Sequence, residues 1–185
     1  MKCKSFAFFI VATLISFATI AQTTVRPAAS IIAAAYKQAG EEKKSVLIIF
    51  HASWCGWCKK MDAALEDPIC KPFFDKYFVI EHLTVQESKG KEYLENPGAQ
   101  EQMDKWEGKG MGLPYWVVLD KEGTVLFDSQ VRKTQPDNTV KGENIGCPAT
   151  KEEVLYFTEI LRKTTNLSSN DLQVIFDRFR KNEQK

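Results

Sequence analysis

Residues 45–60 read Ser45-Val46-Leu47-Ile48-Ile49-Phe50-His51-Ala52-Ser53-Trp54-Cys55-Gly56-Trp57-Cys58-Lys59-Lys60. The apolar run over 46–50 is uninterrupted and rich in β-branched residues, which is typical of a parallel strand buried on both faces of a sheet. Two cysteines separated by two residues follow at the expected start of a helix over 55–65. We therefore expect a central strand that leads through a short turn into a helix headed by a cysteine pair.

Further strands are expected at 77–85, 115–119 and 124–128, and the last two form an antiparallel hairpin around a polar turn. The polar, glycine-containing segment 87–112 is interpreted as an insertion, and 132–148 as a loop rich in Pro, Asn and Gly. This order predicts an α/β fold in which one sheet has a parallel part and an antiparallel part.

Four further helices are expected along the chain. One covers 27–39 and stops at Gly40, and a short one lies at 100–106 inside the insertion. The segment Thr150-Lys151-Glu152-Glu153 has the pattern of a capping box, which opens a helix that ends near residue 163. A last helix, capped by Ser168 or Ser169, is expected to end near residue 180.

Length and composition indicate one globular domain. The chain has 185 residues, of which 44% are hydrophobic and 26% are charged, close to the averages of soluble proteins. Its 25 basic and 24 acidic residues give a formal net charge of +1, without a strongly basic block in the interior. Nucleic acid is therefore excluded as an expected partner, because its binding needs a basic surface.

The N-terminus has the layout of a secretory signal peptide. Two lysines within the first four residues precede an apolar run over 6–20 that ends in Thr19-Ile20-Ala21. The alternative, a membrane anchor, needs roughly 20 apolar residues, and this run is shorter. We expect 1–21 to be a cleaved signal peptide and 22–185 to be the exported domain, periplasmic or secreted.

The cysteine pair has the spacing of a redox-active disulfide. Residues three apart at a helix start have Cα atoms about 5 Å apart, within the disulfide range. Cys55 would lie in the first turn, where unpaired N–H groups and the helix dipole favour a thiolate and lower its pKa. Cys55 is therefore the expected nucleophile, and Cys58, one turn further in and less exposed, the resolving cysteine.

Three other interpretations of the pair are less favoured. A zinc site needs two further ligands, and the remaining Cys and His residues show no second paired spacing. Haem attachment needs a histidine directly after Cys58, where Lys59 stands. A purely structural disulfide across so short a step would restrict the unfolded chain very little. No metal and no cofactor is expected.

The stretch 45–60 resembles the thioredoxin superfamily, and in particular exported bacterial members with a Trp-Cys-Gly-Trp-Cys active site. Gly112-Leu113-Pro114, directly before the strand at 115–119, resembles the family's cis-proline loop. The resemblance implies a thioredoxin fold with a core over about 46–163. The expected N-terminal helix, the insertion before the cis-proline loop and the extra C-terminal helix lie outside the minimal family domain.

The resemblance also implies how the loop and the cysteine pair meet a substrate. The cis-proline loop faces the cysteines, and the backbone of Leu113 pairs with the substrate peptide as an added strand. Trp57 lies between the cysteines on an open turn and would offer an apolar patch to a partner protein. The expected substrate-binding residues are Trp54, Gly56, Trp57, Leu113 and Pro114.

The chain departs from the family at the position six residues before the first cysteine. Many thioredoxins carry a buried acid there that accepts a proton from the second thiol, and this chain has Ile49. Glu81 and Asp62 are alternative acceptors, and both also fit ordinary surface carboxylates. His51 is expected to be packed or hydrogen-bonded rather than to tune Cys55, and His82 has no expected role.

The two remaining cysteines of the exported domain leave two alternatives open. Cys70 and Cys147 either form a second disulfide or remain buried free thiols, and we favour free thiols slightly, because one sequence cannot show that the two lie close together.

The expected function is exchange of disulfides with cysteine-containing exported proteins. Export favours either a reductant fed by a membrane redox relay or an oxidant for newly exported chains, and the Trp-Cys-Gly-x-Cys frame favours the reductant. The alternative is a protein-binding or chaperone-like module whose disulfide is not catalytic. A thiol peroxidase ranks low, because that chemistry centres on a different cysteine motif.

Overall fold

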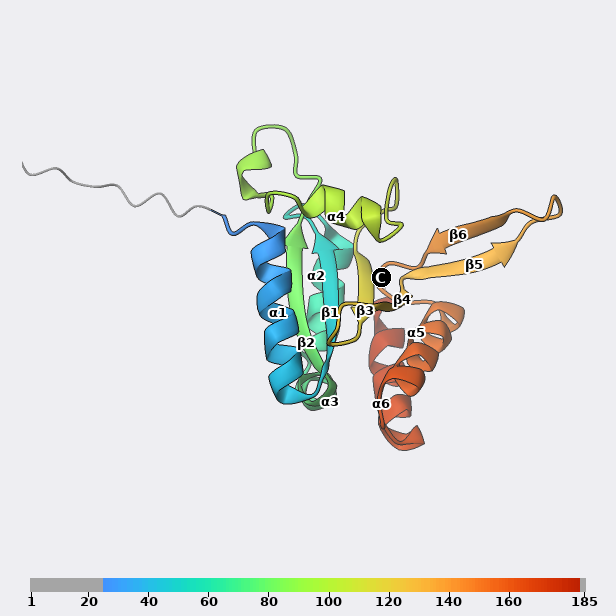
Figure 1. The fold of residues 1–185 in the computed structure, drawn as a ribbon. Helices are drawn as coiled ribbons and strands as arrows, with labels where there is room; N and C mark the ends of the chain where they lie inside the picture. The colour runs from blue at the N-terminus through green and yellow to red at the C-terminus, as the bar shows by residue number, and fades with distance from the viewer. Residues whose placement is uncertain (1–24, 184–185) are drawn as a thin grey trace, which may run out of the picture.

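The computed structural model describes residues 25–183, so the expected signal peptide at 1–21 lies outside the described part. Its main sheet has the order β2-β1-β3-β4 (Figure 1), formed by β1 (Ser45–His51), β2 (Phe78–Thr84), β3 (Tyr115–Leu119) and β4 (Val125–Asp128). β1 pairs in parallel with β2 and antiparallel with β3, and β3 pairs antiparallel with β4. The expected mixed sheet is confirmed.

Helices cover both faces of this sheet (Figure 1). One face packs against α1 (Ala28–Glu42) and α4 (Ala99–Lys105). The other packs against α2 (Gly56–Leu65), α3 (Lys71–Tyr77), α5 (Lys151–Thr164) and α6 (Ser169–Arg180). Two short 3₁₀ helices, η1 (Glu92–Leu94) and η2 (Lys181–Glu183), complete the helical elements of the described residues. The thioredoxin fold with extra N-terminal and C-terminal helices is confirmed.

The burial of β1 follows from its place between the two helical layers. Side chains alternate along a strand, so Leu47 and Ile49 face the layer that contains α2, while Ile48 and Phe50 face the layer that contains α1. All four are at most 1% exposed. Burial of each such side chain contributes about 1.5–3 kcal/mol, which makes β1 the centre of the core.

The capping signals in the sequence place the starts of the last two helices. The Thr150 side chain accepts a hydrogen bond from the Glu153 N–H, and the Glu153 carboxylate accepts one from the Thr150 N–H. Ser168 and Asp171 form the same reciprocal pair at the start of α6. Because each pair satisfies two N–H groups that lack a helical partner, both helices begin where expected.

Two helix expectations were wrong. α1 does not stop at Gly40 but continues to Glu42, and Lys43 ends it in the left-handed conformation with φ 56°. The Lys44 N–H then bonds to the Ala39 carbonyl, so a lysine takes the place that glycine usually fills. The helix α3 was not expected; it begins after Cys70 with a proline in its first turn.

The segment 132–148 is not a plain loop, as was expected. It contains most of a two-stranded antiparallel hairpin, β5 (Gln130–Thr134) and β6 (Val140–Asn144), which projects away from the main sheet (Figure 1). Most of its side chains are polar and exposed on both faces, so the strands lack the apolar alternation that reveals a half-buried strand in a sequence. Among the described residues, no helix has the length and apolar character to cross a membrane.

Candidate active site

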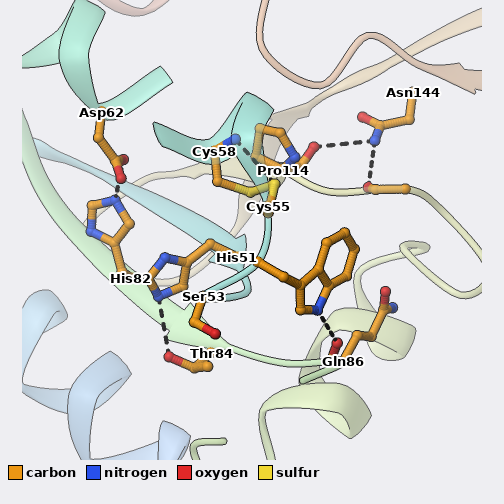
Figure 2. Close-up of a disulfide and its surroundings, with 12 residues drawn as sticks. His51, Ser53, Cys55, Cys58, Asp62, His82, Thr84, Gln86, Pro114 and Asn144 are labelled. Atoms are coloured by element: carbon orange, nitrogen blue, oxygen red, sulfur yellow. Dashed lines mark hydrogen bonds and ion pairs between the residues drawn. A yellow bond between two sulfur atoms is a disulfide. The ribbon is translucent and has the colours of Figure 1, made fainter. Parts of the chain in front are cut away.

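The two cysteines of the central motif form a disulfide at the start of α2 (Figure 2). Cys55 is the N-cap residue, and Cys58 lies in the first turn. Their Cα atoms are 5.3 Å apart and their sulfur atoms 2.03 Å apart. The Cys58 N–H donates a hydrogen bond of 3.0 Å to Cys55 Sγ. A sulfur that accepts a helix N-terminal N–H is placed where the helix dipole stabilises negative charge.

Both cysteines are covered in this disulfide form. Cys55 is 3% exposed and Cys58 is 2% exposed, so the expected difference in exposure between them is absent from the oxidised protein. Ala52 lies in the same apolar cluster, and Leu113 packs against it. The bond holds both sulfur atoms in one small cluster, which explains why one is as covered as the other.

The loop at Pro114 stands against the cysteine pair. Its Leu113–Pro114 peptide bond is cis. Asn144 at the end of β6 donates hydrogen bonds from Nδ2 to the carbonyls of Gly112, at 2.7 Å, and Pro114, at 3.1 Å (Figure 2). The unexpected hairpin therefore fixes the loop from one side. No sequence signal pointed to Asn144, because its contacts lie about thirty residues away in the chain.

Two exposed tryptophans flank the disulfide. Trp54 is 54% exposed and Trp57 is 47% exposed. Trp54 Nε1 donates a hydrogen bond of 2.8 Å to the Gln86 carbonyl, which fixes the plane of its ring. Lys60 Nζ lies 4.3 Å from the centroid of the Trp57 ring, a cation–π contact. Both tryptophan rings therefore present an exposed apolar surface, and the contacts with Gln86 and Lys60 fix their orientation.

A carboxylate anchors the turn that carries the cysteines. Glu87 accepts hydrogen bonds from the Ser53 N–H, at 2.6 Å, and from the Ser53 hydroxyl, at 2.7 Å. Desolvation acts to raise the pKa of Glu87, but the hydrogen bonds from Ser53 and the Ser88 backbone, with the charge of Lys91, together hold that pKa below its ordinary value. The turn before Cys55 is thus tied to the segment that follows β2.

A cavity of about 620 Å³ opens beside the disulfide. Its wall is formed by Trp57 and Lys60 from α2, by Leu113 from the proline loop, and by Ile145 and Cys147 after β6. The lining combines apolar side chains with the charged side chains of Lys60, Glu153 and Glu183. Such a concave, mostly apolar surface suits an extended peptide better than a small polar molecule.

The chain beyond α5 closes one end of this region. Asn182 in η2 accepts a hydrogen bond of 2.9 Å from Lys60 Nζ through its carbonyl, and its Nδ2 lies 3.3 Å from Cys147 Sγ. Arg178 in α6 donates to the Ala63 carbonyl at 2.9 Å and forms an ion pair with Asp67. The extra C-terminal helix therefore braces α2 and covers the Cys147 thiol.

The comparison with protein families agrees with this geometry. Residues 28–121, just over half of the chain, match the model of the family described as thioredoxin-like. The chain belongs to the thioredoxin-like family. Together with the Cys55–Cys58 disulfide in a Cys-Gly-Trp-Cys motif, this membership makes it a thiol:disulfide oxidoreductase of the thioredoxin fold. A comparison with curated protein sequences found no match.

Solved structures of similar fold include three bacterial proteins. The disulphide isomerase from Xylella fastidiosa Temecula1 is 19% identical, with a TM-score of 0.48, over 94% of this chain and 100% of that one. The C-terminal domain of DsbD from Neisseria meningitidis, in the oxidised form, is 22% identical, with a TM-score of 0.39, over 57% and 84%. A thioredoxin from Thermus thermophilus is 16% identical, with a TM-score of 0.39, over 76% and 87%.

The position where many family members carry a buried acid is apolar in this thioredoxin-like chain. Ile49 is fully buried against the layer that contains α2. Of the two carboxylates considered instead, Glu81 pairs with Ile48 in the sheet register, whereas Asp62 bonds to His82 at 2.9 Å. Sequence reasoning assigned His82 no role, because the contact joins β2 to α2 and depends on the fold.

Cys70 and Cys147 are both free and both buried, in agreement with the favoured alternative. Burial raises the pKa of the Cys70 thiol to about 11 and that of the Cys147 thiol to about 12. Thiols of this kind carry almost no thiolate at neutral pH and are poor nucleophiles. Within residues 25–183, no three His, Cys, Asp or Glu side chains are grouped so that they would hold a metal ion.

Alkylation of the native protein tests this division of the cysteines. With Cys3 replaced by serine, we expect iodoacetamide at pH 8 to modify no cysteine in the oxidised protein. After reduction it should modify Cys55 within minutes and leave Cys70 and Cys147 intact, because only thiolates react. When the reduced protein is unfolded in denaturant, all four cysteines should react. Mass spectrometry of the peptides measures each site, and modification of Cys147 as fast as Cys55 in the reduced native protein would contradict the prediction.

Proposed function

We propose that this protein is an exported thiol:disulfide oxidoreductase that reduces disulfides in exported client proteins. The Cys55–Cys58 disulfide at the N-terminus of α2 carries the proposal, because it lies beside a peptide-sized cavity and under two exposed tryptophans. Cys55 is the nucleophile and Cys58 is the resolving cysteine. Trp54, Gly56, Trp57, Leu113 and Pro114 form the client-binding surface.

The reaction starts at the reduced pair. The Cys55 thiolate attacks one sulfur of a client disulfide; a new S–S bond forms, the client S–S bond breaks, and the other client sulfur leaves with the electron pair and takes up a proton. Cys58 then loses its proton and attacks Cys55 Sγ, which closes the intramolecular disulfide and releases the client as a thiolate. The client gains two electrons, and the Cys55–Cys58 pair loses two.

The N-cap position explains why Cys55 attacks first. The N–H of Cys58 points at Cys55 Sγ, and the N-terminus of α2 stabilises a thiolate there. The position where a side chain on Gly56 would begin has no neighbouring atom within 4 Å, so the approach to this turn is open. A client strand that pairs with the Leu113 backbone would bring its disulfide to Cys55.

Export and the electron source are parts of the same proposal. The expected signal peptide at 1–21 supports a periplasmic or secreted location. Each turnover leaves the pair in the disulfide form, and an oxidising compartment does not reduce it again. A reductant in that compartment therefore needs an upstream donor, for which we propose a membrane redox relay. The expected clients are exported proteins that contain cysteines.

The reduction potential of the Cys55–Cys58 pair tests the direction of electron flow. The purified protein is equilibrated with dithiothreitol or glutathione mixtures, and the fluorescence of Trp54 and Trp57 beside the disulfide reports the oxidised fraction. A potential near about −270 mV is the value of a reductant, and we expect this result. A potential near about −120 mV is that of an oxidant and would overturn the reductant role.

A further inference from the structure

The chain contains two histidines, and the fold brings them together. His51 is the last residue of β1 and His82 lies in β2, and their ring centroids are 5.1 Å apart. Figure 2 shows both rings on the side of the sheet that carries the disulfide helix. Two half-buried imidazoles in contact form a cluster of titratable groups that sequence reasoning left without a function.

Each ring is held by a polar partner. His82 Nε2 lies 2.9 Å from Asp62 Oδ1 of α2, and His51 Nε2 lies 3.1 Å from the Thr84 hydroxyl of β2 (Figure 2). The hydrogen bond to Thr84 uses Nε2 of His51, so Nδ1 takes no part in it. The result is a connected row, Asp62, His82 and His51, that links α2 with the two central strands.

This row reaches α2 through Asp62, in the second half of the helix. Asp62 follows Cys58 by one helical turn, so the two side chains share a face of the helix. On the strand side, Ala52 directly follows His51 and belongs to the same small cluster as Cys55 and Cys58. The row therefore meets α2 one turn beyond the resolving cysteine, and on the strand side His51 directly precedes a residue of the cysteine cluster.

Resolution of a mixed disulfide needs a group that takes the proton of Cys58. A thiol with an ordinary pKa of about 8.5 is only about 3% ionised at pH 7, so unassisted attack on Cys55 is slow. Ile49 occupies the buried position six residues before Cys55, and its apolar side chain cannot accept the proton. The histidine row offers the base on this face of α2.

We propose that His51 accepts the proton of Cys58 Sγ, directly or through one water molecule, and that His82 and Asp62 are its positioning residues. This inference rests on the proposed function. As the Cys58 sulfur bonds to Cys55 Sγ and the client thiolate leaves with its electron pair, the proton passes to the neutral imidazole of His51. The imidazolium then releases this proton to water, so that the ring is neutral again before the next turnover.

The charges around His51 suit this role. Burial lowers the pKa of His51, and His82 facing it from β2 lowers it further, while Asp62 from α2 and Glu87 after β2 act in the opposite direction. The pKa of His51 lies below its ordinary value, so the ring is neutral at pH 7 and free to accept a proton. Asp62 at the end of the row stabilises the positive charge that then forms.

The two half-reactions are separable with a chromogenic disulfide. The reduced protein, with Cys3 replaced by serine, is mixed with 5,5′-dithiobis(2-nitrobenzoate): attack by Cys55 releases the first thionitrobenzoate, and attack by Cys58 on the mixed disulfide releases the second. Stopped-flow absorbance at several pH values gives both rates. We expect the wild-type second rate to change little above neutral pH, because a neutral base is already present.

His51→Asn should slow only the second phase, by at least about tenfold at pH 7, and make it rise with pH as a free thiol does. Asp62→Asn should move the acid limb of the second phase to lower pH, because the imidazole loses its stabilising charge. Glu66→Gln is the matched control, since Glu66 caps the same helix and bonds to Lys71 away from the cysteines. It should keep both phases.

A wild-type pH profile in both His51→Asn and Asp62→Asn would overturn the proton-accepting role. Absence of both phases in the wild-type protein would instead overturn the proposed function itself, so the two failures are distinct. His82→Asn, a change at a half-exposed side chain, carries the test if His51→Asn does not fold, and it should also shift the acid limb.

Discussion

Replacing Cys58 by serine is expected to convert the protein from a catalyst into a trap for its clients. Cys55 keeps its N-cap position and still attacks a client disulfide, but no second sulfur remains to release the mixed disulfide. Turnover in an insulin-reduction assay should fall to background. Covalent adducts that disappear on treatment with dithiothreitol should accumulate, and non-reducing gels followed by mass spectrometry identify them.

Two controls give this experiment its meaning. Cys55→Ser removes the nucleophile and should form no adducts, although its surface is unchanged. Cys70→Ser removes a buried thiol that lies outside the cavity and should leave turnover intact. If Cys58→Ser forms no adducts while the wild-type protein still binds unfolded chains through its tryptophans, the disulfide is not catalytic and the protein-binding alternative is correct.

Local patterns in the sequence were enough to place the four strands of the main sheet and the disulfide. The apolar run over 46–50 predicts a strand that is buried on both faces. The spacing of Cys55 and Cys58 predicts the distance between their Cα atoms from helix geometry alone. The capping box at Thr150 and the serine cap at Ser168 or Ser169 place two helix starts to within a residue. Each of these signals depends on residues close together in the chain, so it can be recognised from the sequence alone.

Contacts between distant segments could not be predicted in this way. The His82–Asp62 pair joins residues twenty positions apart, and Asn144 reaches Gly112 over thirty-two. The hairpin that carries Asn144 is polar on both faces, so it lacks a periodic apolar pattern. The resemblance of residues 45–60 and 112–114 to the thioredoxin superfamily implies the disulfide and the proline loop, but it does not imply the polar contacts of His51 and His82.

The largest loss of stability is expected from Phe157→Ala in α5. Phe157 is fully buried, and its ring centroid lies 4.9 Å from Phe179, 5.5 Å from Trp116 and 6.2 Å from Phe74. Truncation of such a ring costs about 3–5 kcal/mol, a large part of the roughly 5–15 kcal/mol that stabilises a domain. Urea unfolding followed by tryptophan fluorescence should show the midpoint lower by roughly 2 M.

Leu155→Ala is the matched control on the same helix, because that side chain is 49% exposed. It should change the free energy of unfolding by less than about 0.5 kcal/mol. Phe157 also holds Phe179 of α6, the helix that leads to Asn182 over the Cys147 thiol. Phe157→Ala should therefore speed alkylation of Cys147 in the folded protein, whereas a loss of under about 1 kcal/mol with Cys147 still protected would mean that α5 and α6 repack without this ring.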